Sequence, residues 1–330
     1  MFLRAVRCPV DVVRVVRVLI VLAAVVLLGA GATAYALRTP EKPSVEVEAG
    51  AVDLAERGRL VFVDEISGKV ASVPLSAPGG PRRVSSLSCK RFYTAAEQGL
   101  CLADASGPLP GATAVFVDRS LSEQQRIEVD GVPNRAKLSA SGRMASWTTF
   151  VTGDSYSQAG TFSTRTAIYD RQTQTYESNI EGVRVAGTKM VNDMNYWGVT
   201  FTPDDHTYYA TLGTGGKTYL IQADAADSSG TKVRENVECP SLSPDGKRVA
   251  FKKRVPGDGV RPWREHVLNL DTMVETPLAE TRGIDDQVVW LDDDTIAYGL
   301  PGEGIWAVRA DGEGEPRQLV PHASSPSLVS

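Results

Sequence analysis

Four nine-residue stretches of this chain align with one another without a gap. They are SASGRMASW from Ser139, TPDDHTYYA from Thr202, SPDGKRVAF from Ser243 and WLDDDTIAY from Trp290. In each stretch a short polar turn leads into a short apolar segment, and the stretches recur at intervals of roughly 40 to 60 residues, a period typical of repeat architectures. The chain is therefore expected to fold as an array of similar small units.

Each full unit divides into four short strands, because apolar residues alternate between clusters of Gly, Pro and Asp. The third strand gives the clearest count, since it runs into an aspartate. Its copies end at Asp118, Asp170, Asp224, Asp271 and Asp311, and Lys69–Leu75 adds a degenerate sixth. The spacing is close to that of one propeller blade, about 40 to 50 residues. The sequence thus predicts an all-β fold, with a six-bladed β-propeller over residues 57–330.

The two ends of this region predict how the ring closes. Ser325-Pro326-Ser327-Leu328 repeats the Cys239-Pro240-Ser241-Leu242 pattern that begins a blade, yet no second strand follows it. The missing partners lie at the start of the region, in Arg59–Val63, Lys69–Leu75 and Arg82–Val84. We therefore expect the C-terminal strand to be the innermost strand of an N-terminal blade, which removes free sheet edges. A frayed C-terminal tail is the alternative.

The SPDGKRVAF segment and its looser copies resemble the repeat of TolB-like and PD40-type (WD40-like) six-bladed β-propellers. The similarity spans roughly Arg57 to Ser330, and the layout with an apolar N-terminus resembles that of membrane-anchored TolB-like proteins of actinobacteria. No segment like the separate N-terminal α/β domain of periplasmic TolB precedes the repeats. The resemblance therefore implies the propeller fold but does not carry over the partners of TolB.

The N-terminus predicts export through a membrane. Residues 1–17 form a basic segment, expected to be cytoplasmic, and residues 18–37 are uncharged and long enough for a transmembrane helix. Residues 38–56 contain Pro40 and Pro43 and are expected to form a tether. The positive-inside rule then places the propeller outside the membrane, as a single-pass protein. Ala32-Thr33-Ala34 fits a signal-peptidase site, so a cleaved signal segment and a secreted protein is the alternative.

Charge and cysteine content narrow the possible partners further. After removal of residues 1–38 the basic residues fall from 35 to 30 and the acidic ones from 40 to 39, a net charge of −9. This balance excludes nucleic acid as an expected partner. In an oxidising compartment Cys89 and Cys101, which are close in sequence, are the expected disulfide pair, leaving Cys239 free. Three reduced, buried cysteines are the alternative.

The acidic residues of the turns allow two interpretations. Asp204-Asp205, Asp245 and Asp292-Asp293-Asp294 have the oxygen-rich spacing that a calcium ion prefers. They also occupy equivalent turns in several units, where aspartate bonds to nearby backbone amides. We favour the turn, and expect no metal and no cofactor.

No catalytic arrangement is evident in the sequence. The three histidines, His206, His266 and His322, belong to a turn, a third strand and the closing segment, and no GxSxG, HExxH, CxxC or Walker motif occurs. We therefore expect no catalytic residues and a protein that is not an enzyme. A propeller lyase or hydrolase with a metal centred in the channel is the alternative.

One set of candidate binding residues follows from the predicted architecture. If the first strands line a central channel, the residues that enter them gather around one mouth, where loops on a rigid scaffold often bind ligands. These residues are Arg91, Arg135, Asp193, Asn195, Glu238, Asp285, Asp286 and Gln287. The alternative is that they only satisfy the polar groups of the channel itself. Lys252-Lys253-Arg254 is interpreted as a solvated strand end.

These features together predict an extracytoplasmic, non-catalytic interaction or ligand-binding module. The expected partner is an envelope protein or a cell-wall ligand, and the N-terminal helix is expected to provide the contact with the membrane.

Overall fold

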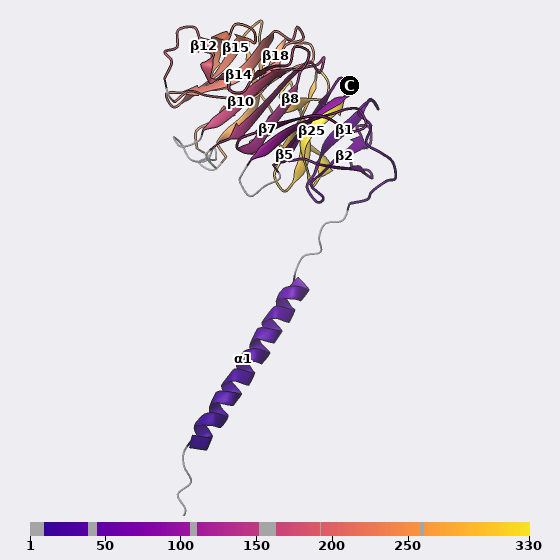
Figure 1. Ribbon diagram of the computed structural model, residues 1–330, viewed down its shortest axis with the longest axis vertical. Helices are drawn as coiled ribbons and strands as arrows, with labels where there is room; N and C mark the ends of the chain where they lie inside the picture. Colours follow the sequence, from indigo (N-terminus) through magenta and orange to yellow (C-terminus); the bar gives the residue numbers. More distant parts are fainter. Residues whose placement is uncertain (1–9, 39–44, 106–110, 152–162, 192, 258–260) are drawn as a thin grey trace, which may run out of the picture. The chain divides into compact units, whose positions relative to one another are not determined.

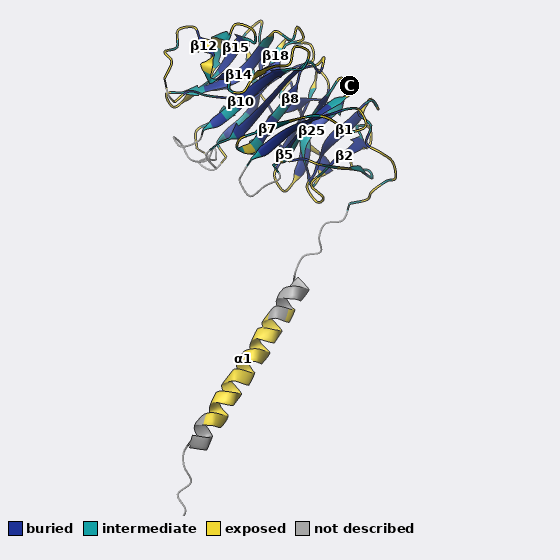
Figure 2. Cartoon of the chain, viewed as in Figure 1, coloured by how far each residue is buried: buried dark blue, intermediate teal, exposed yellow. Residues whose placement is uncertain are grey.

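The structure is a computed structural model of the chain, and it describes residues 10–38, 45–105, 111–151, 163–191, 193–257 and 261–330. The chain divides into two units, residues 1–44 and 45–330. In the first unit, helix α1 (Val10–Arg38) contains a stretch, Arg14–Gly31, that is long and apolar enough to cross a membrane. The side chains of this stretch are exposed, as Figure 2 shows. The expected apolar N-terminal helix is therefore confirmed.

The second unit consists of strands, which form six sheets in the described residues. Each sheet is one blade, and the blades are numbered here along the chain. Blade 1 contains β25 (Ala323–Val329), β1 (Arg59–Asp64), β2 (Lys69–Pro74) and β3 (Arg83–Ser88). Blade 2 contains β4 (Arg91–Ala95), β5 (Gln98–Asp104), β6 (Ala112–Val117) and β7 (Glu123–Val129). Blade 3 contains β8 (Val132–Leu138), β9 (Met144–Phe150), β10 (Thr164–Asp170) and β11 (Thr175–Glu177). Blade 4 contains β13 (Asn195–Phe201), β14 (Thr207–Thr214), β15 (Lys217–Asp224), β16 (Ser229–Glu235) and the added β12 (Arg184–Val185), which follows the 3-10 helix η1 (Ile180–Gly182). Blade 5 contains β17 (Glu238–Leu242), β18 (Arg248–Arg254), β19 (Trp263–Asn269) and β20 (Glu275–Pro277). Blade 6 contains β21 (Val289–Trp290), β22 (Thr295–Leu300), β23 (Gly304–Arg309) and β24 (Arg317–Pro321).

The first strands of the six blades form a closed ring. Strand β4 contacts β25 and β8, β13 contacts β8 and β17, and β21 contacts β17 and β25. The predicted all-β, six-bladed propeller is thus confirmed (Figure 1).

Blade 1 closes the ring as the sequence predicts. Strand β25 pairs antiparallel with β1, and Leu328 lies opposite Leu60. The hydroxyl of Ser327 accepts a hydrogen bond from the Thr94 backbone N–H at 2.9 Å and donates one to the Thr94 carbonyl at 3.3 Å. The C-terminal strand therefore connects the N-terminal blade to blade 2, and it is not a frayed tail.

Residues of the inner strands are more buried than residues of the outer strands. Every residue of β1 is buried, whereas the outermost strand of blade 2, β7, alternates between exposed and half-buried side chains. Inner strands are covered on both faces because a neighbouring blade packs against each side of the sheet. Aromatic rings fill this space, as where Phe116 packs against Trp147 and Tyr169 with ring centroids 6.3 and 5.6 Å apart.

The turns between first and second strands use their aspartates locally. The Oδ1 atom of Asp204 accepts the His206 backbone N–H at 2.8 Å, and that of Asp245 accepts the Lys247 N–H at 3.0 Å. Gly246 supplies the left-handed conformation that the second turn requires, with φ +72°. These contacts agree with the turn interpretation of the acidic residues.

The segment before β1 differs from the expected free tether. Val47 forms a parallel bridge with Arg82, and Val52 and Leu54 are buried in the propeller core. The proline-based interpretation overlooked the alternating sequence Val45-Glu46-Val47-Glu48, a pattern of period two that is typical of a strand. Residues 45–56 therefore belong to the propeller unit.

Arg82 connects this segment with the closure of the ring. Its backbone N–H donates to the Glu46 carbonyl and its own carbonyl accepts the Glu48 N–H, both at 2.9 Å. The buried guanidinium pairs with Asp64 of β1 and donates to the Pro321 carbonyl just before β25. Arg82 thus connects residues 46–48, strand β1 and the residues just before β25.

Candidate functional site

The channel opens into a cavity at the mouth where the first strands begin. This cavity has a volume of about 390 Å³. Both signs of charge are represented among its lining residues, which include Glu65, Lys90, Arg91, Asp104, Asp285 and Asp286. We call it the charged mouth.

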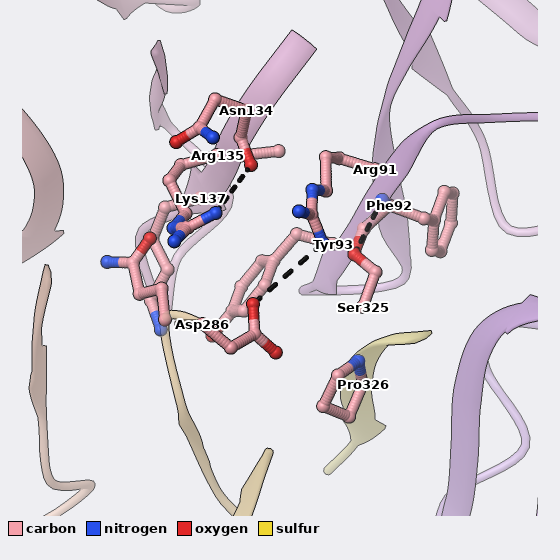
Figure 3. A pocket seen from close by; sticks show the side chains of 11 residues that line it. Arg91, Phe92, Tyr93, Asn134, Arg135, Lys137, Asp286, Ser325 and Pro326 are labelled. Atoms are coloured by element: carbon pink, nitrogen blue, oxygen red, sulfur yellow. Dashed lines mark hydrogen bonds and ion pairs between the residues drawn. The ribbon is translucent and has the colours of Figure 1, made fainter. Parts of the chain in front are cut away.

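Below the charged mouth the channel narrows sharply. The space beside Arg91, Arg135, Lys137 and Asp286 has a volume of only about 20 Å³, which is room for a single water molecule. Figure 3 shows Arg91 and Asp286 facing each other across this constriction, with Arg135 and Lys137 projecting from β8.

Contacts that cross the axis close the channel at this level. The Arg135 Nη2 atom, from blade 3, lies 3.2 Å from Asp285 Oδ1 in the loop that enters blade 6. The Gln287 amide from the same loop donates to the carbonyls of Val199 and Pro240, at 3.1 and 2.9 Å. These contacts obstruct the central channel, so the cavities at its two ends are separate from each other.

Asp285 forms ion pairs with two cationic side chains, Arg135 and Lys252. The Nζ atom of Lys252 lies 2.6 Å from its Oδ1, and the Lys252 side chain is fully buried. Burial by itself would raise the pKa of Asp285, but the charges of Lys252 and Arg135 outweigh it and lower the pKa to about 2. Burial would likewise lower the pKa of Lys252, yet Asp285 and the other nearby acidic groups raise it. Both groups stay charged at neutral pH.

A buried row of ionisable residues continues from Lys252 into blade 5. Lys252 of β18 lies opposite Glu238 of β17 and Glu265 of β19 in the sheet register. Glu265 is 0 % exposed, and neither of its carboxyl oxygens has a hydrogen-bond partner among the described residues. Burial raises its pKa to about 8, and the charge of Lys252 only partly opposes the shift. Glu265 is therefore largely protonated at neutral pH.

Asp286 and Arg91 face each other at a longer distance. Their closest charged atoms are 3.8 Å apart. The second oxygen of Asp286, Oδ2, accepts the Gly299 backbone N–H at 2.9 Å. Asp286 thus fixes the first strand of blade 2 against the second strand of blade 6.

The structure brings five of the eight candidate residues together at the charged mouth and the constriction: Arg91, Arg135, Asp285, Asp286 and Gln287. Glu238 is fully buried within blade 5, where its carboxylate lies 2.7 Å from the Arg254 guanidinium. Asp193 accepts hydrogen bonds from Thr214 and Gly215 at the next hairpin, and Asn195 accepts the Thr164 N–H. These three residues lie outside the described lining of the two cavities.

Several residues of the site were missed by reasoning from the sequence. Lys90 and Asp104 form an exposed ion pair of 3.1 Å at the charged mouth. Glu65 of blade 1 lines the same cavity. Asp104 ends β5 and Glu65 follows β1, so neither lies at the start of a first strand, whereas Lys90 directly precedes β4 beside the candidate Arg91. The interpretation of Lys252 as a solvated strand end is wrong, because its alternation with Ala250 places it on a face covered by blade 6.

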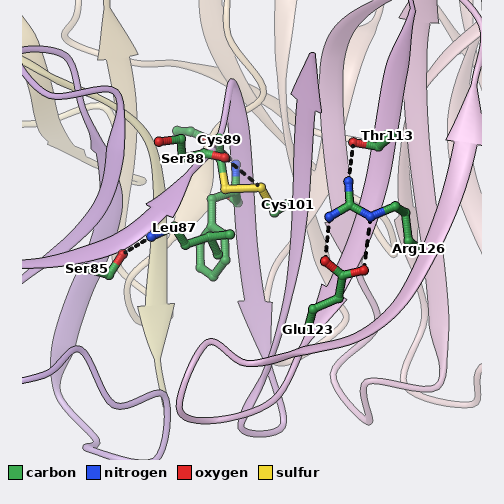
Figure 4. The surroundings of a disulfide bond; sticks show 10 residues. Ser85, Leu87, Ser88, Cys89, Cys101, Thr113, Glu123 and Arg126 are labelled. Atoms are coloured by element: carbon green, nitrogen blue, oxygen red, sulfur yellow. Dashed lines mark hydrogen bonds and ion pairs between the residues drawn. A yellow bond between two sulfur atoms is a disulfide. The ribbon is translucent and has the colours of Figure 1, made fainter. Parts of the chain in front are cut away.

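A disulfide bond lies next to the charged mouth. Cys89 precedes β4 and is joined to Cys101 of β5, with Cα atoms 5.5 Å apart (Figure 4). Cys239 is a buried free cysteine. The disulfide restrains Lys90 and the start of β4, where Arg91 lies.

Metal ligands are not grouped in the described part of the chain. Within those residues, no cluster of three or more His, Cys, Asp and Glu side chains is arranged to hold a metal ion.

Comparisons with known proteins add information on the fold. No family model matches the sequence, and no curated protein matches it. TolB from Acinetobacter baumannii is similar in structure, with 15% identity, a TM-score of 0.60 and coverage of 82% of this chain and 66% of the TolB chain. The chain thus spans slightly less than two thirds of that protein.

Two further solved structures are similar to this chain. A chain of a nidogen/laminin complex has 13% identity and a TM-score of 0.55, with coverage of 82% of this chain and 98% of that one. An oligogalacturonate lyase in complex with manganese has 11% identity and a TM-score of 0.47, with coverage of 78% of this chain and 72% of that one. The chain has the β-propeller fold of TolB and related PD40-type propellers.

Proposed function

We propose that this protein is a membrane-anchored, extracytoplasmic interaction module that binds a protein partner of the cell envelope through the charged mouth, without catalysing a reaction. The observation that carries the proposal is a mixed-charge cavity of about 390 Å³ above a channel that is closed by ion pairs. Such a surface offers a concave site with a rigid floor.

The charges of the mouth suit recognition of a polar partner. Lys90 and Asp104 are 60% and 62% exposed, so both remain available to a partner. Complementary charges at the rim of an interface contribute mainly to specificity and to the rate of association. Because Arg135 and Asp285 hold the floor in place, binding requires little reordering of side chains, which favours affinity.

The location at the envelope rests on the N-terminal helix and the disulfide. An apolar helix preceded by arginines directs the following chain across a membrane. A disulfide between Cys89 and Cys101 is typical of an oxidising compartment. We infer retention of the helix as an anchor; the same residues also fit a cleaved signal segment.

The structural similarities support a protein partner over a small substrate. The nidogen/laminin propeller belongs, by its description, to a complex between proteins. A cell-wall ligand remains the second type of partner that fits a polar mouth.

The test is capture of partners by the full-length protein from cross-linked membranes. The double variant Lys90→Glu with Asp104→Lys exchanges the charges of these two exposed residues but keeps an ion pair between them. We expect it to lose the captured protein at an unchanged thermal midpoint. The matched control exchanges Lys217 and Glu235, an exposed ion pair of 2.8 Å on blade 4, and should capture the partner normally.

Three outcomes would contradict the proposal. Equal capture by both exchanged variants would show that the mouth is not the binding face. Sedimentation with purified cell wall, without a captured protein, would indicate a wall ligand. A stoichiometric transition metal in the purified protein would favour a metal-dependent propeller enzyme.

A further inference from the structure

The opposite mouth of the channel contains a second cavity of different character. It lies where the first strands end and has a volume of about 230 Å³. Apolar and aromatic side chains make up most of its wall, including Tyr93, Leu138, Phe201, Leu242, Trp290 and Leu328. We call it the apolar mouth. The constriction at Arg135 and Asp285 lies between it and the charged mouth.

A lysine lies at the inner end of the apolar mouth. Lys137, on β8, lines both this cavity and the constriction, and its side chain is only 7% exposed. Its Nζ atom donates a hydrogen bond to Ser241 Oγ at 3.2 Å and lies 4.4 Å from the centroid of the Tyr93 ring. An ammonium group has three N–H donors, so one hydrogen bond leaves most of its capacity unused.

No carboxylate of the described residues forms an ion pair with Lys137, whereas the two other buried cations of the constriction, Arg135 and Lys252, both pair with Asp285. Asp286 lines the same constriction, but its oxygens face Arg91 and the Gly299 N–H. The Lys137 ammonium group therefore has no direct carboxylate partner among the described residues. A buried charge is costly unless an opposite charge accompanies it.

We propose that the apolar mouth binds a carboxylate carried by a short apolar group. The carboxylate accepts hydrogen bonds from Lys137 Nζ and Ser241 Oγ, and the apolar group packs against Leu138, Phe201 and Leu242. A cavity of about 230 Å³ is smaller than the 300–1,000 Å³ typical of sites for larger ligands, so it fits one terminal residue of a peptide or a short aliphatic acid. This site is separate from the partner-binding face proposed above.

The experiment measures whether full-length protein distinguishes an acid from its uncharged amide. Isothermal titration with hexanoate and with hexanamide, at pH 7, compares two probes of nearly equal size and apolar surface. We expect the wild-type protein to bind hexanoate at least tenfold more tightly. The variant Lys137→Met, which keeps an unbranched apolar chain but removes the ammonium, should lose this preference, and the control Lys217→Met on an exposed lysine of β15 should keep it.

A second variant blocks the cavity without changing Lys137. Ala140 is exposed at the rim of the apolar mouth, so Ala140→Trp adds bulk at a surface turn where it does not disturb the core. We expect it to weaken hexanoate binding at least tenfold with an unchanged circular dichroism spectrum. This variant keeps the proposal testable if Lys137→Met fails to fold.

A parallel titration identifies the source of the carboxylate. N-acetyl-alanyl-leucine that binds at least tenfold more tightly than hexanoate indicates a peptide terminus, and the reverse order indicates a small aliphatic acid. The proposal is overturned if the wild-type protein binds acid and amide equally, or if Lys137→Met or Ala140→Trp binds hexanoate as the wild type does. Capture of a protein by the charged mouth is measured independently, so failure of either proposal can be told from failure of the other.

Discussion

The guanidinium of Arg135 lies 3.2 Å from the carboxylate of Asp285, although 150 residues separate them in the sequence. Arg135 belongs to the first strand of blade 3, and Asp285 to the loop that enters blade 6, on the opposite side of the ring. Lys252 of blade 5 contacts the same carboxylate oxygen at 2.6 Å. Three parts of the ring thus meet at one carboxylate on its axis.

Removal of that carboxylate should destabilise the whole ring. Asp285→Asn removes the carboxylate shared by Lys252 and Arg135 and leaves Lys252 with the more distant carboxylate of Glu238, at 3.9 Å. The free energy of unfolding should fall by about 2–3 kcal/mol, somewhat less than for a fully buried pair, because 36% of the Asp285 side chain is exposed. Urea denaturation measures the change, and Asp104→Asn at an exposed ion pair should cost at most about 1 kcal/mol. Equal effects of the two variants would show that the axial contacts do not brace the ring.

Glu265 predicts a dependence of stability on pH. The folded state raises its pKa from 4.5 to about 8, so the folded protein holds a proton that the unfolded chain has already released. Its contribution to stability is therefore complete below pH 4.5 and is lost as the pH rises towards 8. Glu265→Gln keeps the shape without the ionisation and should be more stable than the wild type at pH 8, by about 1–3 kcal/mol, but not at pH 4.5. Parallel changes of both proteins from pH 4.5 to 8 would exclude Glu265 as the cause.

The serine hydroxyls of the closing strand should contribute measurably to closure. Ser325 and Ser327 each accept a backbone N–H of β4, from Phe92 at 3.0 Å and Thr94 at 2.9 Å. Ser327→Ala leaves the Thr94 N–H without this partner in the interior and should lower the free energy of unfolding by about 1–3 kcal/mol. Ser325→Ala should have a smaller effect, since Ser325 is only half-buried. Ser324→Ala is the control on the same strand, and a change beyond about 0.5 kcal/mol there would mean that the effect is not specific to the hydroxyl contacts.

The disulfide predicts a difference between reducing and oxidising conditions. Cys89 and Cys101 are separated by 12 positions in the sequence and so close a short loop, and loss of such a bond costs about 2–4 kcal/mol. Dithiothreitol should therefore lower the urea midpoint of the wild type and of Cys239→Ala, but leave the double variant Cys89→Ala with Cys101→Ala unchanged. A double variant that still responds to the reductant would exclude this bond as the source of the difference.

The architecture could be predicted because the same pattern of turns and strands recurs in the sequence once for each blade of the ring. Turns that correspond to Ser243-Pro244-Asp245-Gly246 mark the passage from a first to a second strand, so a count of these turns and of the third strands gives the blades. The match between Ser325–Leu328 and Cys239–Leu242 indicated ring closure, because a first strand requires a second one beside it.

The site could be predicted only in part, because its contacts cross between blades. Arg91 was found through its place at the start of a first strand, and Asp285 through its place in the segment that leads into one. Lys252 and Glu265 were not found, since in a propeller both faces of an inner strand are covered and alternation does not reveal which face holds a charge. Lys137 was overlooked for the same reason, as its role depends on a cavity formed by strands from several blades.

The position of Arg82 has a mechanical consequence. Its backbone holds residues 46–48 alongside blade 1, and its guanidinium holds the approach to the C-terminal strand. Tension applied to the chain from its N-terminal side reaches this arginine before it reaches β1. Through Arg82 the load is therefore passed to β1 and to the residues just before β25, so that blade 1 resists it with both of its terminal segments.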